Sequence, residues 1–354
     1  MTIGTRRPRA WLLSAYRADS HAAWADWLLA SQPQVDWRRL ELPGRHFAWR
    51  IRGNPLSWLD ALPAEAPDLL LATSMVDLAT LKGLHPRLAE VPALYYFHEN
   101  QFAYPLSDRQ NHWLEPCMVQ LYGGLAADRL LFNSAFNRSS YLEGVATLLT
   151  QMPDAVPAGI VERLTQKSEL CPVPIAPVSA AAERDPQLVL WNHRWEHDKA
   201  PEVFAEAMIA LAGEGVPFRL ALLGKRPRQV PPALARLREA LPERIVADGR
   251  LPLDEYRTQL GRAGIAVSTA RHEFQGLAML EAASAGARPL VPDALCYPEQ
   301  YPPVCRYPEG DSAALVARLR KWLGGDLPPA VDVSPWHADR LAPLWAEVLG
   351  TLAT

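Results

Sequence analysis

The sequence predicts an α/β protein of two domains, each a parallel β-sheet covered by helices. Three observations support this fold class. The chain has 354 residues, more than one domain of ordinary size needs. Short apolar runs alternate with stretches of helical periodicity in each half, which is typical of βαβ units. A stretch rich in proline and alanine, residues 152–184, separates the two halves and predicts an inter-domain crossing.

The first half contains four apolar runs of strand length and four helix-like stretches between or after them. The predicted strands are residues 10–16, 68–73, 93–97 and 129–133. The predicted helices are residues 20–30, 75–81, 113–127 and 136–149. This order favours a parallel sheet with helical crossovers.

The second half repeats the alternation. The predicted strands are residues 188–191, 219–223, 245–247, 265–268 and 288–291. The predicted helices are residues 201–211, 232–240, 253–263 and 277–285, and the tail from 334 to 352 also has a helical pattern. The domains are therefore predicted as residues 1–177 and 178–333, with the helix in 334–354 able to pack back on the first domain.

Composition excludes several classes of protein. With 36 basic and 39 acidic residues the formal net charge is −3, so the chain has no global basic field for nucleic acid. The four cysteines show neither a CxxC pair nor zinc-site spacing, and they fit buried thiols in a reducing compartment. No apolar run approaches the length of a membrane span and the start does not resemble a signal peptide, so we expect a cytoplasmic protein.

Two Rossmann-like domains joined by a crossing are expected to enclose an inter-domain cleft. Ligands of open α/β sheets bind beyond the carboxyl ends of the strands. The residues that do chemistry are therefore expected in loops that follow strands.

The segment RHEFQGLAMLE, residues 271–281, directly follows a predicted strand. Glu273 would lie in the loop, Gly276 would allow close backbone approach at a helix start, and free N–H groups there can hold a diphosphate. Glu281 would lie on the helix, near enough to accept hydrogen bonds from hydroxyl groups. A capped helix with a surface glutamate is the plainer alternative, and spacing alone does not separate the two.

A second segment, WNHRWEHDK at residues 191–199, follows the first strand of the second half. It places Arg194 and Lys199 in a loop that enters a helix. Two cations there can neutralise a leaving diphosphate. A solvated helix start is the alternative, although cations at the positive end of a helix dipole are slightly unfavourable.

The first half offers polar residues at strand ends. His98 ends the strand in YYFHEN and is a candidate to bond the sugar or position the acceptor hydroxyl, unless it is only a loop histidine packed on Phe102. Ser20 and His21 follow the first strand, where Ser20 is more simply a helix cap. Asn133 ends the fourth strand, before a serine that can cap the next helix.

Cations and aromatics interleave in residues 45–52, a composition that suits phosphates and a stacked base. Residues 1–52 contain nine arginines against four acidic residues, so a local basic patch exists within an acidic chain. An edge hairpin with ordinary surface arginines is the alternative.

The two segments of the second half, in this order and on these elements, resemble the retaining glycosyltransferases of the GT-B fold that include sucrose and glycogen synthases. The resemblance implies that Glu273 contacts the transferred sugar, that Glu281 binds the ribose, and that Arg194 and Lys199 stabilise the diphosphate. That family usually has Pro-Phe-Gly after the first glutamate, whereas this chain has Phe274-Gln275-Gly276, which leaves the shape of the sugar pocket open.

Longer motifs across nearly the whole chain resemble the family of tRNA-queuosine mannosyltransferases. They are LPGRHFAWR at 42–50, YFHENQ at 96–101, FNSAFN at 132–137, HRWEHDK at 193–199 and HEF at 272–274. This resemblance implies transfer of mannose from GDP-mannose to the cyclopentenediol of queuosine in a tRNA anticodon. It makes nucleotide-sugar and queuosine-containing tRNA the expected partners, with no cofactor.

The expected site residues fall into three sets. The catalytic set is His98, Glu273, Arg194 and Lys199. The donor-binding set is Arg194, Lys199, Gly224, Phe274, Gln275, Gly276, Leu277, Ala278 and Glu281. The acceptor-binding set is Ser20, His21, Arg45, His46, Trp49, Arg50, Glu99, Asn100 and Asn133.

The sequence contains no Asp-x-Asp motif, so we expect no metal at the diphosphate. No carboxylate stands out as a nucleophile, and we expect same-face attack with retention of configuration. Two alternatives stay open: an enzyme of the same fold with a lipid, glycan or small-molecule acceptor, and a catalytically silent RNA-binding protein.

Overall fold

The computed structural model describes residues 6–104, 114–178 and 183–351, which form two compact units. Unit 1 comprises residues 1–173 with 339–354, and unit 2 comprises residues 174–338. The sequence-based boundary at 177/178 falls a few residues further along the chain. The outer ends of two predicted helices, Trp113 and Leu352, lie outside the described residues.

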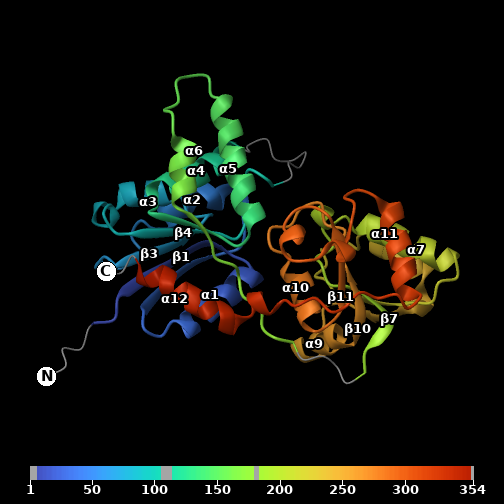
Figure 1. The fold of residues 1–354 in the computed structure, drawn as a ribbon. Helices are drawn as coiled ribbons and strands as arrows, with labels where there is room; N and C mark the ends of the chain where they lie inside the picture. Colours follow the sequence, from blue (N-terminus) through green and yellow to red (C-terminus); the bar gives the residue numbers. More distant parts are fainter. Residues whose placement is uncertain (1–5, 105–113, 179–182, 352–354) are drawn as a thin grey trace. The chain divides into compact units, whose positions relative to one another are not determined.

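Unit 1 contains a six-stranded parallel sheet in the order β2-β1-β3-β4-β5-β6 (Figure 1). Its strands are β1 (Arg9–Arg17), β2 (Asp36–Pro43), β3 (Leu69–Thr73), β4 (Ala93–Phe97), β5 (Arg129–Phe132) and β6 (Ser168–Leu170). The strands β3 and β4 are buried at every position, as expected of parallel strands covered on both faces. The strand order reverses between β1 and β3, which marks a topological switch point.

Helices cover both faces of this sheet. They are α1 (Asp19–Ser31), α2 (Phe47–Trp58), α3 (Leu78–Leu84), α4 (Leu114–Ala126), α5 (Ala135–Thr150), α6 (Ile160–Gln166) and α12 (Ala338–Gly350). In Figure 1, α1 and α12 lie on one face and α2 to α6 on the other. The tail helix joins the first unit through Trp345, whose ring lies 5.5 Å from Trp24 and 5.1 Å from Tyr96.

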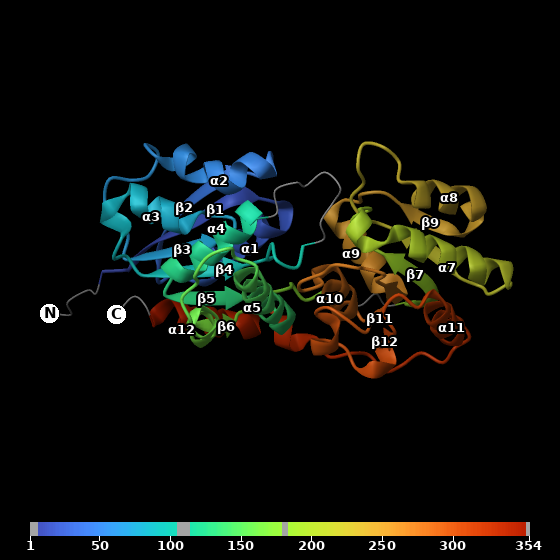
Figure 2. The same ribbon diagram turned by 90° about the horizontal axis from the view of Figure 1, so that it is seen from above.

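Unit 2 repeats the design with the strand order β12-β11-β10-β7-β8-β9. Its strands are β7 (Asp185–Trp191), β8 (Arg219–Leu222), β9 (Ile245–Asp248), β10 (Ala263–Val267), β11 (Arg288–Pro292) and β12 (Arg306–Tyr307). Its helices are α7 (Pro201–Gly213), α8 (Pro232–Ala240), α9 (Leu253–Arg262), α10 (Leu277–Ser284) and α11 (Ser312–Leu323). Figure 2 shows α7, α8 and α11 on one side of the strands and α9 and α10 on the other.

The structure corrects several parts of the sequence-based prediction, which also omitted α11 and β12. The stretch 152–184 is not a single crossing, because α6 and β6 lie within it and complete the sheet of unit 1. The edge hairpin, which was the alternative for residues 45–52, does not form: α2 begins at Phe47 and follows the unpredicted edge strand β2. That strand escaped prediction because its sequence, DWRRLELP, is polar and only partly buried.

Smaller expectations have mixed outcomes. Ala18, not Ser20, is the N-cap of α1, and Ser20 lies exposed in the first turn. Ser134 caps α5 as predicted, accepting a hydrogen bond from the Asn137 N–H at 2.9 Å. All four cysteines are buried free thiols, as predicted. No helix in the described part of the chain is long and apolar enough to cross a membrane.

Candidate active site

The loops that follow β7 and β10 meet at the switch point of the second sheet, because these two strands are neighbours. Backbone hydrogen bonds join the loops directly. The N–H groups of Arg271 and His272 donate to the Asp198 carbonyl at 2.9 and 3.2 Å. The hydroxyl of Thr269 donates to the carbonyls of Lys199 and Ala200, each at 2.9 Å. The two segments singled out in the sequence therefore form one structural unit.

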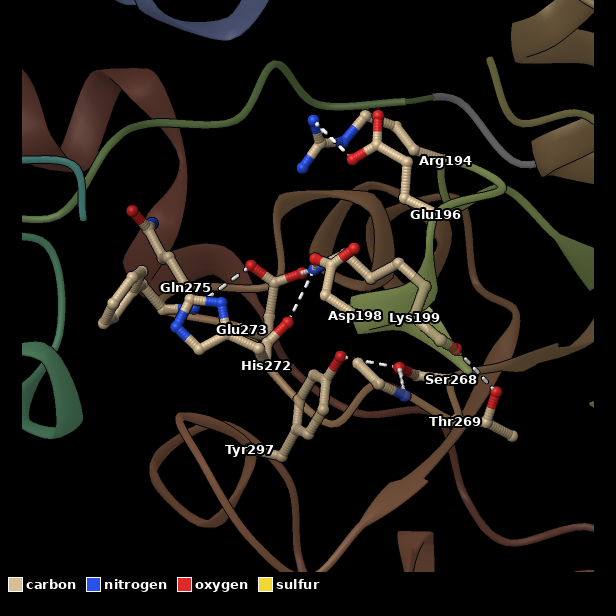
Figure 3. A network of polar contacts seen from close by, with 12 residues as sticks. Arg194, Glu196, Asp198, Lys199, Ser268, Thr269, His272, Glu273, Gln275 and Tyr297 are labelled. Atoms are coloured by element: carbon tan, nitrogen blue, oxygen red, sulfur yellow. Dashed lines mark hydrogen bonds and ion pairs between the residues drawn. The ribbon is translucent and has the colours of Figure 1, made fainter. Parts of the chain in front are cut away.

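A buried ion pair lies at the centre of this unit (Figure 3). The Lys199 ammonium is 3.1 Å from Glu273 Oε2 and 3.1 Å from Asp198 Oδ2, and it donates to the His272 carbonyl at 2.6 Å. These three contacts use its three N–H donors. The Lys199 side chain is only 8% exposed, so a diphosphate can reach this ammonium only by exchanging one of the present acceptors.

The electrostatics keep the pair charged. Burial opposes ionisation of Glu273, but the Lys199 charge, His193 and hydrogen bonds from Gly276 and Lys199 outweigh it and lower the pKa of the carboxyl to about 2. Burial likewise opposes the ammonium, yet Glu273 and Asp198 raise the pKa of Lys199. Burial and then the Lys199 charge lower the pKa of His193 to about 4, so this imidazole is neutral at pH 7.

The start of α10 presents amide groups beside Glu273. Gly276 adopts a left-handed conformation with φ of 66°, and a Cβ there would lie 2.9 Å from the Tyr297 ring. The Phe274 N–H donates to Glu273 Oε1 at 3.1 Å, and the Gln275 carbonyl accepts from the Gln300 amide at 2.6 Å.

The next two amides, those of Leu277 and Ala278, are the first of the helix and have no acceptor among the described residues. They remain available to an anion.

A glycine is required at position 224, in the loop after β8, because the backbone of another loop approaches it closely. A Cβ at this position would overlap the carbonyl oxygen of His193 and lie 3.2 Å from the Arg194 nitrogen. The loops after β7 and β8 therefore touch backbone to backbone, which brings Gly224 to the segment predicted to bind the donor.

Glu281 lies on α10 in a second polar cluster. Its Oε2 accepts from the Tyr256 hydroxyl at 2.9 Å, and that hydroxyl also accepts from the Asn192 amide at 3.2 Å. Burial raises the pKa of Glu281, although the Tyr256 hydrogen bond and the Arg257 charge partly offset this. The carboxylate retains acceptor capacity for hydroxyl groups of a ligand.

The structure does not bring Arg194 to Lys199. The Arg194 guanidinium pairs with Glu196 at 3.0 Å, and both side chains are about half exposed, at 51% and 48%. Figure 3 shows this pair apart from the contacts of Lys199. A role of Arg194 at the diphosphate stays a prediction.

In unit 1, His98 lies at the carboxyl end of β4 in a ring cluster. Its imidazole stacks on His21 with centroids 4.1 Å apart and packs edge-on against Trp24 and Tyr96, each at 4.7 Å. Burial and then His21 lower the pKa of His98 well below the ordinary value, so the ring is neutral. Its Nε2 has no partner within the described chain. The alternative, in which His98 packs on Phe102, is wrong, because the ring neighbours of His98 are His21, Trp24 and Tyr96.

Two asparagines predicted to bind acceptor are engaged within the protein. Asn133 donates to the His98 carbonyl at 2.8 Å and accepts from Asn137 at 2.8 Å. Asn100 is fully buried, donates to Asn137 and Ser140 and accepts from the Ala103 N–H at 2.9 Å. The structure thus assigns both a role in holding the His98 loop. Glu99, in the same loop, is partly exposed.

The remaining predicted acceptor residues surround the start of α2. Arg45 and His46 are exposed, Trp49 is 58% exposed and Arg50 is buried. The sequence-based reasoning missed Asn192, His193 and Tyr256. The first two lie within the quoted segment after β7 and were accessible to the strand-end argument, whereas Tyr256 reaches Glu281 only through the packing of α9 on α10.

Comparison with solved structures shows the fold. Sucrose-phosphate synthase from Thermosynechococcus elongatus superposes with a TM-score of 0.70 over 98% of this chain and 99% of its own, at 14% identity. The Anabaena protein HepE in complex with UDP gives a TM-score of 0.67 over 97% of this chain and 100% of its own, at 12% identity. Two Rossmann-like units of this kind constitute the GT-B architecture predicted from the sequence.

Comparison of sequences shows the family. Residues 9–175 match the family described as tRNA-queuosine alpha-mannosyltransferase N-terminal. The Drosophila melanogaster tRNA-queuosine alpha-mannosyltransferase is 32% identical over 310 residues, which cover 84% of this chain and 82% of that protein. The motifs that suggested a resemblance thus reflect common descent, and the chain belongs to the tRNA-queuosine alpha-mannosyltransferase family of glycosyltransferases.

Proposed function

We propose that this protein transfers mannose from GDP-mannose to the cyclopentenediol of queuosine in tRNA, in the cytoplasm, with retention of configuration and without a metal ion. The observation that carries the proposal is the Lys199–Glu273 pair beside the unpartnered amides of α10. Membership of the family supports the acceptor, because its Drosophila member is named for queuosine in tRNA.

The geometry supports a division of labour within the donor site. The Leu277 and Ala278 amides are suited to the diphosphate, and Glu281 with Tyr256 is suited to the ribose hydroxyls. Glu273, held anionic by Lys199, is suited to accept hydrogen bonds from sugar hydroxyls. The diphosphate charge is then met by backbone amides and by cations, as Lys199 exchanges an acceptor and Arg194 moves from Glu196.

In the proposed reaction one bond breaks and one bond forms at the anomeric carbon. The bond from C1 of mannose to the β-phosphate oxygen breaks, and a bond from C1 to the acceptor oxygen forms on the same face. The acceptor hydroxyl gives its proton to the departing β-phosphate, so the products are an α-mannoside and GDP. Both oxygens of Glu273 already accept hydrogen bonds, which favours a binding role over a nucleophilic one.

The test uses radiolabelled GDP-mannose and UDP-glucose, each with queuosine-containing and queuosine-free tRNA. We expect label only in queuosine-containing tRNA and only from GDP-mannose, with unchanged rate in EDTA. NMR of the product should show the α anomer. Label from UDP-glucose would overturn the proposed donor, and label in queuosine-free tRNA would overturn the proposed acceptor. A β anomer would overturn retention of configuration, and loss of activity in EDTA would overturn metal independence.

A further inference from the structure

A buried guanidinium without a counter-ion lies on α2 of unit 1. Arg50 is only 8% exposed, its Nε is enclosed without a partner, and no carboxylate of the described chain pairs with it. The neighbouring Arg52, by contrast, is half exposed and pairs with buried Asp77. Enclosing a cation without an anion or hydrogen-bond acceptors is costly, so such a group points to a ligand that supplies the anion.

The start of the same helix favours an anion independently. α2 begins after His46, whose φ is 55° and whose side chain caps no N–H group. The amides of Phe47 and Ala48 have no acceptor among the described residues, and the first turn contains no acidic side chain. Side chains of a helix lean toward its N-terminus, so Arg50 extends toward this first turn. The helix dipole, the free amides and the guanidinium therefore all favour a negatively charged ligand.

An exposed aromatic side chain adjoins this position. Trp49 is 58% exposed, and its indole lies against Gly53, where a Cβ would come within 2.7 Å of Cζ2 and 2.8 Å of Nε1. The absence of a side chain at Gly53 thus lets the indole rest on the helix. Its other side faces solvent and can stack on a planar group.

The same end of the sheet contains His98. The ring of Tyr16 packs on Phe47 with centroids 6.3 Å apart, and the Tyr16 carbonyl contacts His21 Nδ1 at 3.0 Å. His21 in turn stacks on His98. A chain of direct contacts within unit 1 therefore connects the start of α2 to the predicted acceptor position.

From these observations we infer that the first turn of α2 binds one phosphodiester group of single-stranded RNA, with Arg50 and the helix amides on the phosphate and Trp49 stacked on the adjacent base. An anion site beside an aromatic platform matches a nucleotide rather than a free phosphate. The inference rests on the proposed function, because it names the part of the RNA acceptor that this surface holds.

The experiment measures binding of fluorescein-labelled single-stranded RNA to the full chain over a range of salt concentrations, by fluorescence anisotropy. The probe has an anticodon-loop sequence without queuosine, and a second probe of equal length contains abasic sugars. We compare Arg50→Gln and Trp49→Ala with Arg163→Gln, which removes the same charge from an exposed position on α6. Thermal unfolding of each variant verifies the fold.

Arg50→Gln is expected to weaken both probes about tenfold or more and to reduce the salt slope by about one, while Arg163→Gln changes neither. Trp49→Ala is expected to weaken the base-containing probe about tenfold and to leave the abasic probe unchanged. Equal affinity of Arg50→Gln and Arg163→Gln overturns the phosphate site. A Trp49→Ala loss of equal size on both probes overturns the stacking, and Trp49→Ala still decides the question if Arg50→Gln unfolds.

No nucleotide-sugar enters this experiment, so its outcome is separate from that of the transfer assay. Binding as expected with failed transfer to queuosine would reject the proposed function and keep the RNA site. Transfer of mannose as expected, with RNA affinities of Arg50→Gln and Arg163→Gln that do not differ, would keep the proposed function and reject the RNA site. Binding of anionic lipid vesicles in place of RNA, lost in Arg50→Gln, would overturn the choice of ligand.

Discussion

The ionised state of Glu273, which Lys199 favours together with His193 and the Gly276 N–H, should stabilise unit 2 by about 3 kcal/mol at pH 7. The charged atoms of Lys199 and Glu273 are 3.1 Å apart, and their side chains are 8% and 20% exposed. The pKa of Glu273 lies at about 2, against an ordinary value of 4.5, even though burial alone would raise it. At about 1.4 kcal/mol for each pH unit, that difference corresponds to about 3 kcal/mol.

The perturbation is a double-mutant cycle with Lys199→Met and Glu273→Gln, singly and together. Urea unfolding of unit 2, followed by hydrogen exchange of its peptides, yields the free energy of unfolding of each variant. Lys199→Met should cost about 3 kcal/mol or more, since it leaves the carboxylates of Glu273 and Asp198 without their cation. Glu273→Gln should cost less, because Asp198 still pairs with the ammonium, and the double variant should cost less than the sum of the two.

A matched cycle on Arg236→Gln and Glu206→Gln serves as the control. These two side chains lie in the same unit, their charged groups are 3.3 Å apart, and each side chain is more than half exposed. Their coupling should not exceed about 1 kcal/mol.

The pH dependence of the coupling free energy tests whether the ionised carboxylate is the stabilising form. A carboxyl with a depressed folded-state pKa contributes its stability above the unfolded-state value near 4.5 and loses it as the pH falls toward 2. The coupling between Lys199 and Glu273 should therefore be constant from pH 6 to 8 and shrink below pH 4.5. A coupling below about 0.5 kcal/mol at pH 7, or one that grows on acidification, would refute the electrostatic reasoning.

Three further predictions follow from the described contacts. Tyr256→Phe should weaken GDP binding about fivefold in calorimetry, because Glu281 loses the hydroxyl that orients it, and an unchanged affinity would contradict the ribose role. Gly224→Ala should lower the free energy of unfolding by about 3 kcal/mol in urea, whereas Gly213→Ala, with open space around it, should have a much smaller effect; equal effects would contradict the close approach. His98→Gln should lower turnover about a hundredfold, and the wild-type rate should show no titration of His98 between pH 6 and 8, since its pKa is depressed; a histidine titration there that disappears in His98→Gln would contradict a neutral ring.

Most of the fold was predictable because strand-like and helix-like segments alternate clearly in both halves of the chain. Strands such as β3 and β4 are continuous apolar runs, and the turn to unit 2 is rich in proline. The elements that escaped prediction are β2, α2, α6, β6, β12 and α11. The strands β6 and β12 and the helix α6 are too short for a period to stand out, and β2 is polar, whereas the helical pattern of α11 was overlooked. Propensity also argued against α2, which contains Pro55. Because proline has no N–H, the Ile51 carbonyl instead accepts from the Asn54 amide at 3.1 Å.

The candidate site was predictable where strand order alone brings residues together. Lys199 and Glu273 follow neighbouring parallel strands, so a strand-end argument places them at one edge. Spacing could not show that Arg194 turns to Glu196, because side-chain direction in a loop depends on tertiary packing. Nor could it show that Asn100 and Asn133 hydrogen-bond within the protein, since burial of a loop asparagine is not visible in the sequence.

The return of α12 to unit 1 has a consequence for synthesis of the protein. Unit 2 is one continuous segment inserted into unit 1, and Trp345 packs against Trp24 and Tyr96 of the first-made sheet. On the ribosome, unit 2 can close its sheet as soon as its own residues have emerged. Unit 1 cannot be completed until residue 345 has emerged, and until then the rings of Trp24 and Tyr96 lack their contact with Trp345. A nascent chain arrested before that point should therefore expose an aromatic surface to chaperones.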